Sequence, residues 1–236
     1  MPDRDRPLYA VLIDADNIPA KFAGAILKEI TSFGEPALRR VYGDWSSGRL
    51  NTWSGVVRDL GLVAHQETAN TKGKNASDIG LVIDAMDILH TGRFDGFVLV
   101  SSDSDFTALA NRVREQGLDV IGIGEAKAPE ALRNVCNRFI LIENIVEESE
   151  PAPKGKASAR KTPPQDAVPL ILRAMDKIPQ DGEWYALGQL GQYIQAENPD
   201  FDTRTYGKRK LSDLLQDLKR FETRKSGNRF EVRRAD

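Results

Sequence analysis

The sequence predicts an α/β protein: a parallel sheet with helices on both faces, followed by a small C-terminal α+β domain. Over residues 8–142, short apolar runs alternate with amphipathic segments, as expected for a parallel sheet covered on both faces. Residues 147–166 are rich in Pro, Ala, Ser and Lys without apolar periodicity, which is typical of a flexible linker. We therefore expect a first domain over residues 1–146, a linker over 147–166 and a second domain over 167–236.

Six apolar runs are the predicted strands of the first domain. They are Leu8–Ile13, Ala37–Tyr42, Leu62–His65, Phe97–Val100, Val120–Ile123 and Phe139–Ile142. Helical patterns lie between them, near residues 20–32, 48–60, 77–90, 105–116 and 129–137. In the 77–90 segment we expect Ser77 to cap the helix and Gly92 to close it. The predicted buried stripe of this helix is Ile79, Val82, Ile83, Met86 and Leu89. Asp84 falls nearly opposite that stripe, which predicts an exposed side chain.

The second domain resembles a winged helix in its order of elements. Helical patterns cover residues 168–179, 186–195 and 205–221, and a hairpin is expected around Ser226-Gly227-Asn228. Basic residues crowd the predicted start of the third helix, where a helix-turn-helix would meet phosphates: Arg204, Lys208, Arg209 and Lys210. The hairpin adds Arg224, Lys225, Arg229, Arg233 and Arg234. Tyr206 is a candidate for stacking on a base. A solvated charged face is the alternative reading of these residues.

Composition excludes several classes of protein. The chain has one cysteine, Cys136, which excludes an internal disulfide and a cysteine-based zinc site. No apolar run approaches the roughly 20 residues that span a bilayer, and the start is not that of a signal peptide, so we expect a cytoplasmic protein. Residues 151–236 carry 17 Lys and Arg against 12 Asp and Glu, a net +5, which leaves −7 of the total −2 for residues 1–150. This split predicts different partners for the two domains.

Carboxylates follow two predicted strands at the points where the strands end. Asp14 and Asp16 leave the first strand in VLIDADN, and Asp103 and Asp105 leave the fourth in VLVSSDSD. Asp78 lies in the first turn of the helix after TKGKNAS. Because sites of open α/β sheets form outside the carboxyl ends of the strands, we expect these acids at one edge. Helix capping by Asp16 near Pro19, and a first-turn role for Asp105, remain as alternatives.

Clustered carboxylates repel one another unless a cation lies among them, which predicts Mg²⁺ or Mn²⁺. The expected metal ligands are Asp14, Asp78, Asp103 and Asp105. Asn17 is a candidate to hold a water or a phosphate oxygen, and Ser101 and Ser102 are candidates to orient the acids. Lys72 and Lys74 are candidates to neutralise phosphate charge. Such a site suits hydrolysis of a phosphodiester.

At these residues the first domain resembles the NYN family, a branch of the PIN-like nucleases. The matching segments are LIDADNI at 12–18, KGKNASDIGLVIDAMDIL at 72–89 and LVSSDSDFTALANRVREQGLDVIGIG at 99–124. The resemblance implies a PIN-like, metal-dependent ribonuclease fold whose acids correspond to Asp14, Asp78, Asp103 and Asp105, with Asn17 beside them. Residues 183–224 resemble an OST-HTH/LOTUS module, which implies RNA binding or, in some members, protein docking.

The leading hypothesis is a divalent-metal-dependent endoribonuclease with a C-terminal RNA-binding module. One alternative is a non-catalytic RNA- or protein-binding regulator whose acids hold a structural ion. Another is a haloacid-dehalogenase-type phosphatase with Asp14 as nucleophile, which needs a later basic residue such as Lys127.

Overall fold

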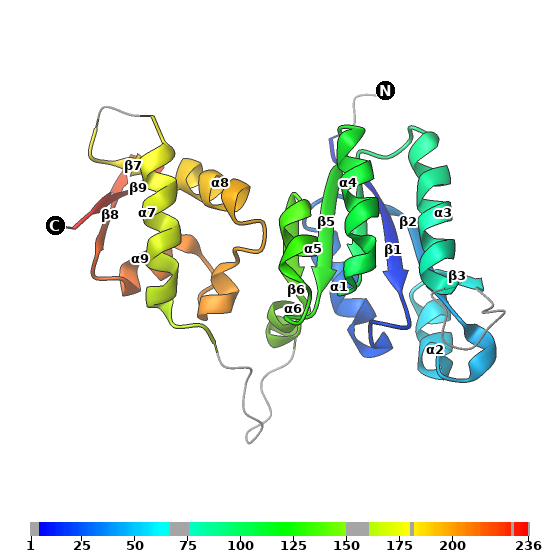
Figure 1. The fold of residues 1–236 in the computed structure, drawn as a ribbon. Helices are drawn as coiled ribbons and strands as arrows, with labels where there is room; N and C mark the ends of the chain where they lie inside the picture. The colour runs from blue at the N-terminus through cyan, green and yellow to red at the C-terminus, as the bar shows by residue number, and fades with distance from the viewer. Residues whose placement is uncertain (1–4, 67–75, 150–160, 180–181, 228, 236) are drawn as a thin grey trace, which may run out of the picture. The chain divides into compact units, whose positions relative to one another are not determined.

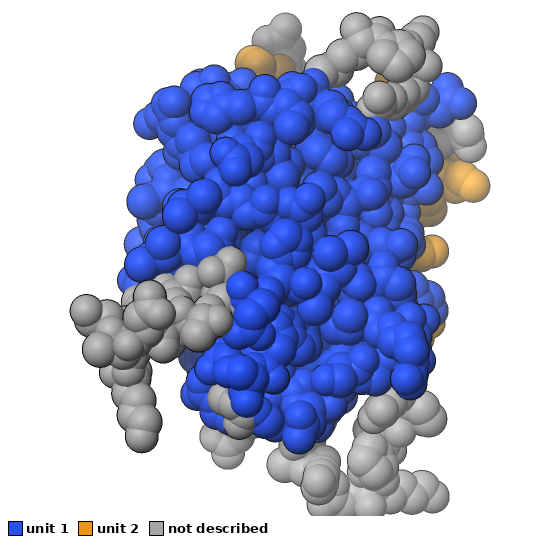
Figure 2. Space-filling view, turned by 90° about the vertical axis from the view of Figure 1, so that its right-hand side faces the viewer, with its two compact units in different colours: residues 1–151 blue, residues 152–236 orange. Residues whose placement is uncertain are grey.

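The computed structural model describes residues 5–66, 76–149, 161–179, 182–227 and 229–235. The chain divides into two compact units, residues 1–151 and 152–236, which Figure 2 shows in blue and orange. Within the described ranges, no helix combines the length and the apolar character needed to cross a membrane.

The first unit is a six-stranded parallel sheet with helices on both faces, which confirms the predicted fold class (Figure 1). Its strands are β1 (Leu8–Asp14), β2 (Glu35–Gly43), β3 (Val63–Gln66), β4 (Gly96–Val100), β5 (Asp119–Gly124) and β6 (Arg138–Leu141). Its α-helices are α1 (Ala23–Ile30), α2 (Asn51–Asp59), α3 (Ala76–His90), α4 (Thr107–Glu115), α5 (Glu130–Val135) and α6 (Ile142–Ser149). Short 3-10 helices η1 (Ala20–Phe22), η2 (Trp45–Ser47) and η3 (Ser104–Phe106) precede α1, α2 and α4.

Two hydrophobic cores lie on the two faces of this sheet. Side chains of β1 alternate between them: Val11 and Ile13 belong to one core, and Ala10 and Leu12 to the other. Helices α1, α2 and α6 complete the first core, and α3, α4 and α5 complete the second. The strand order is β3-β2-β1-β4-β5-β6, so the direction of winding reverses between β1 and β4. Ligand sites of open α/β sheets form at such a switch point.

Helix α3 is rotated relative to the prediction. Of the predicted stripe, Leu89 is buried and Val82 and Met86 are partly buried, whereas Ile79 and Ile83 are 60% and 58% exposed. Leu81, Ala85 and Ile88 complete the buried face. The helix is apolar around most of its circumference, so more than one stripe satisfies helical periodicity. The rotation also makes the prediction for Asp84 wrong: its carboxylate forms an ion pair with Arg40 and accepts a hydrogen bond from the Tyr42 hydroxyl. The helix begins at Ala76, so Ser77 lies inside its first turn, and Gly92 closes it with φ +62°.

The second unit packs three α-helices against a three-stranded antiparallel sheet. Its elements are η4 (Pro164–Ala167), α7 (Val168–Lys177), β7 (Tyr185–Ala186), α8 (Leu187–Glu197), η5 (Thr203–Tyr206), α9 (Leu211–Asp217), β8 (Phe221–Ser226) and β9 (Arg229–Arg234). The sheet order is β7-β9-β8, and Leu190, Leu214 and Val232 are among its core residues. The hairpin was predicted; the short strand β7 was not.

The segment expected as a linker is structured at both ends. Helix α6 continues to Ser149, and the Thr162 N–H donates a hydrogen bond to the Thr205 carbonyl, 3.1 Å away, within the second unit. The acidic run after Ile142 has apolar side chains, Ile145 and Val146, that pack on the first core. Residues 150–160 lie outside the described residues.

Candidate active site

The carboxyl ends of β1 and β4 meet at the switch point, and Asp14 lies there. Its side chain is buried, although β1 ends at this residue. One carboxylate oxygen, Oδ1, accepts hydrogen bonds from the backbone N–H groups of Asp16 (3.1 Å) and Asn17 (3.2 Å). The other, Oδ2, accepts one from the Ser101 hydroxyl, 2.9 Å away, in the turn after β4. Ser101 therefore orients this acid, as the sequence predicted.

Uncharged groups join the turns after β1 and β4. The side-chain oxygen of Asn17 accepts a hydrogen bond from the Ser102 N–H at 3.0 Å, so this amide oxygen holds the two turns together. The Ser102 hydroxyl accepts a hydrogen bond from the Glu125 N–H at 2.8 Å instead of contacting an acid. Gly124 allows this packing, because a Cβ at that position would lie 2.6 Å from the Ser101 carbonyl oxygen.

Burial and repulsion act on the acids of this edge. Burial raises the pKa of Asp14 to about 6, the Ser101 hydroxyl opposes this rise, and the charges of Asp78 and Asp16 add to it. Burial also raises the pKa of Asp78, with further contributions from Asp103, Asp105 and Asp16. The structure thus places acids from β1, α3 and the turn after β4 within electrostatic reach of one another. Asp78, on α3, interacts with acids of both other segments.

Capping explains part of this pattern. Asp103 is the N-cap of η3, and its carboxylate accepts a hydrogen bond from the Asp105 N–H at 3.0 Å. Asp105 is an exposed acid in the first turn. The capping alternative for Asp16 is wrong, because η1 follows Pro19 without a side-chain cap. Capping therefore accounts for the positions of Asp103 and Asp105, and it leaves their carboxylates at the edge of the sheet.

The chemistry of these side chains fits a hard divalent cation. All candidate donors are carboxylate, amide or hydroxyl oxygens, which Mg²⁺ and Mn²⁺ prefer, and the mutual repulsion that raises the pKa of Asp78 is what a cation would relieve. Among the residues that the structure describes, no three or more His, Cys, Asp or Glu side chains are placed to hold a metal ion together. The four-carboxylate ligand set therefore stays a prediction.

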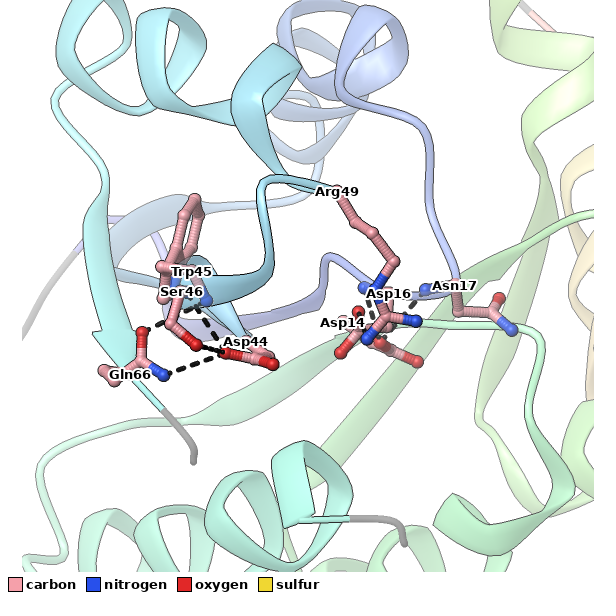
Figure 3. Close-up of polar contacts among 8 residues, drawn as sticks. All are labelled: Asp14, Asp16, Asn17, Asp44, Trp45, Ser46, Arg49 and Gln66. Carbon is pink, nitrogen blue, oxygen red and sulfur yellow. Dashed lines mark hydrogen bonds and ion pairs between the residues drawn. The ribbon is translucent and has the colours of Figure 1, made fainter. Parts of the chain in front are cut away.

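Sequence reasoning missed a cation beside these acids. Arg49 precedes α2, and its guanidinium Nη2 lies 3.9 Å from Asp16 Oδ1, with 71% of the side chain exposed (Figure 3). Asp16, Asn17 and Arg49 line a groove of 220 Å³ together with Leu50 and Thr52. The sequence placed Arg49 in the helical pattern predicted near residues 48–60, whereas α2 begins at Asn51 and Arg49 precedes it. Nothing in that pattern indicated a contact with Asp16.

Next to Arg49, the end of β2 carries a second polar cluster (Figure 3). The Asp44 carboxylate accepts hydrogen bonds from the Ser46 hydroxyl (2.6 Å) and the Gln66 amide (3.2 Å). These hydrogen bonds lower the pKa of Asp44, and the Arg49 charge adds to the effect. The backbone N–H of Trp45 donates to the Gln66 side-chain oxygen at 3.1 Å, which connects the ends of β2 and β3.

Several residues that the sequence predicts to contact nucleic acid are ion-paired or lie outside the described residues. Lys72 and Lys74 lie outside the described residues. Arg204 forms a largely buried ion pair with Asp202 at 2.7 Å, and Lys208 pairs with Asp217. Both acids therefore neutralise cations that the sequence assigned to phosphates.

The predicted third helix begins later than expected. Gly207 has φ +75° and separates η5 from α9, which starts at Leu211. Arg209 and Lys210 are exposed before that start. Tyr206 is half-buried and packs against Phe201, with ring centroids 5.8 Å apart.

Comparison with known proteins identifies both units. The NYN domain family matches residues 9–143, and the OST-HTH/LOTUS domain family matches residues 161–232. A crystal structure of a protein of unknown function from Vibrio parahaemolyticus is 20% identical, with a TM-score of 0.51, and the match covers 60% of this chain and 96% of that one. A solution structure of an uncharacterized protein from Nitrosomonas europaea is 32% identical, with a TM-score of 0.27, over 36% of this chain and 87% of that one. No curated protein matches the chain.

Proposed function

Because the chain belongs to the NYN domain family, a branch of the PIN-like nucleases, we propose that it is a divalent-metal-dependent endoribonuclease. The OST-HTH/LOTUS domain that follows is an RNA-binding module, and we propose that it binds the substrate RNA. The observation that carries the proposal is Asp14: a buried, hydrogen-bonded carboxylate at the switch point, within electrostatic reach of Asp78.

The proposed ligands of the cation are Asp14, Asp78, Asp103 and Asp105. A bound Mg²⁺ or Mn²⁺ would supply Lewis acidity and neutralise charge at a phosphodiester. Ser101 and the N–H groups of Asp16 and Asn17 fix the Asp14 carboxylate before any substrate arrives.

Three side chains bear on whether water or a protein group attacks the phosphodiester, and they favour water. Arg49 is an exposed cation at the edge of the groove, and we propose that it binds a substrate phosphate. Ser101 is a poor candidate for a nucleophile, because its side chain is buried and its hydroxyl accepts from the Asp103 N–H at 3.1 Å. Burial raises the pKa of Cys136 to about 12, so this thiol is not a nucleophile either.

The phosphatase alternative finds little support in the surroundings of Lys127. This side chain forms an ion pair with Glu125 at 2.5 Å and is 64% exposed. A phosphatase would need the ammonium beside a phosphorylated Asp14.

The test is cleavage of single-stranded and structured RNA, and of matched DNA, with Mg²⁺, Mn²⁺ or a chelator. We expect metal-dependent cleavage by the wild type and a loss of about 100-fold or more in Asp14→Asn and Asp78→Asn. Asp87→Asn is the matched control, since Asp87 is an exposed acid on the opposite side of α3 from Asp78.

Equal cleavage by all variants would refute the assigned acids. RNA affinity in chelator, without cleavage under any metal, would instead support the alternative of a non-catalytic RNA- or protein-binding regulator.

A further inference from the structure

The second unit carries an apolar groove that the proposed nuclease chemistry does not use. It has a volume of 560 Å³, within the range of small-ligand sites of about 300–1,000 Å³. The groove lies between the start of α8 and the hairpin strand β9. Its lining includes Leu187, Gly188, Gly191, Leu211, Arg229 and Phe230.

Phe230 is an exposed aromatic side chain at one wall of this groove. It is 48% exposed, although it lies on the same face of β9 as Val232, which is buried in the core. Two glycines of α8 leave the space beside it open. A Cβ at Gly188 would meet no atom within 4 Å, and one at Gly191 would lie 3.6 Å from Leu211 Cδ2, an ordinary contact.

The cations of the hairpin differ in their partners. On the face away from the core, Arg224 pairs with Glu231 at 2.7 Å and Arg233 pairs with Glu222 at 2.8 Å, and both guanidinium groups lie over the Trp184 ring. Acids of the same domain therefore neutralise these two arginines.

The groove has the opposite character. Arg229 alternates with Phe230 and so shares the side of β9 with Arg233, but it lies next to the turn and is the charged lining residue of the groove. No carboxylate lines the groove among the described residues. Lys225 lies opposite Phe230 in the hairpin, with its ammonium 6.0 Å from the ring centroid, and the exposed Lys210 precedes Leu211. An occupant that suits this groove has a flat apolar face with negative charge next to it.

We propose that this groove binds an unpaired nucleobase of single-stranded RNA, stacked on Phe230, with the adjacent phosphates on Arg229 and Lys225. Stacking on an exposed aromatic ring flanked by cations is how sequence-tolerant sites hold single strands. The inference rests on the proposed RNA-binding function and deepens it. It moves the contact from the predicted Arg204, Tyr206 and Lys208 to the far end of the hairpin.

The test is binding of a fluorescently labelled single-stranded RNA to the full chain, measured by anisotropy in chelator so that no cleavage occurs. Phe230→Leu keeps the apolar bulk and removes the aromatic face, and we expect it to weaken binding about 5- to 150-fold. Phe230→Trp should retain wild-type affinity. Gly188→Leu should weaken binding by filling the groove, and its melting temperature checks the fold.

Arg229→Gln and Arg233→Gln form a matched pair, because each removes one positive charge from β9. We expect Arg229→Gln to reduce the slope of log affinity against log salt by about 0.7, the value for one phosphate contact on a single strand. Arg233→Gln should leave the slope unchanged, since its guanidinium is already paired.

Wild-type binding with unchanged affinity in Phe230→Leu and Gly188→Leu would overturn the proposal and leave RNA binding in place. This is also the result expected if the groove takes an apolar segment of a protein. Weakened binding in these variants, together with an absence of cleavage by the wild type under any metal, would refute the nuclease and support the groove. Failure of the wild type to bind RNA would overturn both the proposed RNA-binding function of the second domain and the base-binding groove.

Discussion

Replacing Asp14 by asparagine should stabilise the first unit while abolishing cleavage. The pKa of Asp14 is about 6 in the folded chain, against 3.8 for an unperturbed aspartate, chiefly because the side chain is buried. The folded state therefore holds this proton more tightly than the unfolded state does. The resulting stability is fully present below about pH 4 and is lost as the pH rises through about 6. The shift of about two pKa units corresponds to roughly 3 kcal/mol.

Asparagine removes the free-energy cost of burying a charged carboxylate and keeps part of the hydrogen bonding. Its carbonyl oxygen can still accept from the N–H groups of Asp16 and Asn17, while the charge-assisted bond from Ser101 is lost. We therefore expect the advantage of Asp14→Asn over the wild type to be about 2 kcal/mol larger at pH 7.5 than at pH 4.5.

The assay is urea unfolding in chelator, followed by tryptophan fluorescence. A Trp184→Phe background leaves Trp45 and Trp53, which both belong to the first unit. The control is Asp16→Asn, which removes a charge from an exposed side chain at the same edge and should change stability by less than about 0.5 kcal/mol. An advantage of equal size at both pH values, or a variant less stable than the wild type at pH 7.5, would refute the reasoning.

Three further substitutions test the packing around these acids. Burial raises the pKa of Asp14 and the Ser101 hydroxyl lowers it, so Ser101→Ala should move the acidic limb of the pH–rate profile to higher pH. Asp84→Ala leaves Arg40 without its partner; it should lower the unfolding free energy by about 1–3 kcal/mol in denaturation experiments and leave the cleavage rate of the folded protein unchanged. Gly124→Ala places a Cβ against the turn after β4 and should cost about 1–3 kcal/mol and reduce cleavage.

Each of these variants has a control in the same kind of position. Ser104→Ala changes an exposed serine in the same turn, and Asp87→Ala an exposed acid on the same helix as Asp84. Gly24→Ala adds a Cβ where no atom lies within 4 Å. An unmoved pH profile in Ser101→Ala, lost cleavage in folded Asp84→Ala, or wild-type stability in Gly124→Ala would contradict the respective explanation.

Strands β1, β4 and β5 were predictable because they are buried, and the buried strands of a parallel sheet are short, continuous apolar runs. The orientation of α3 was not predictable, since its sequence offers apolar residues on most sides and the contacts that select one side are distant in sequence. Arg40 and Tyr42 of β2 hold Asp84, 44 and 42 residues away along the chain. Periodicity contains no information about such partners.

The residues of the candidate site likewise fall into those that the sequence could locate and those that it could not. Asp14 and Asp103 could be located because strand ends fix the position of the residues that follow them. Arg49 reaches Asp16 from an irregular segment, and no local pattern announces that contact. Arg204 and Lys208 were assigned to phosphates from local charge alone. That reasoning missed their ion pairs with Asp202, two residues before Arg204, and with Asp217, in α9.

The bond between Asn17 and Ser102 joins two groups whose charge does not depend on pH or on bound ions. The framework beneath the acids should therefore persist at neutral pH when a chelator has removed the metal. Inhibition by removal of metal should then be reversible within the mixing time when the ion is restored, with no slow recovery phase.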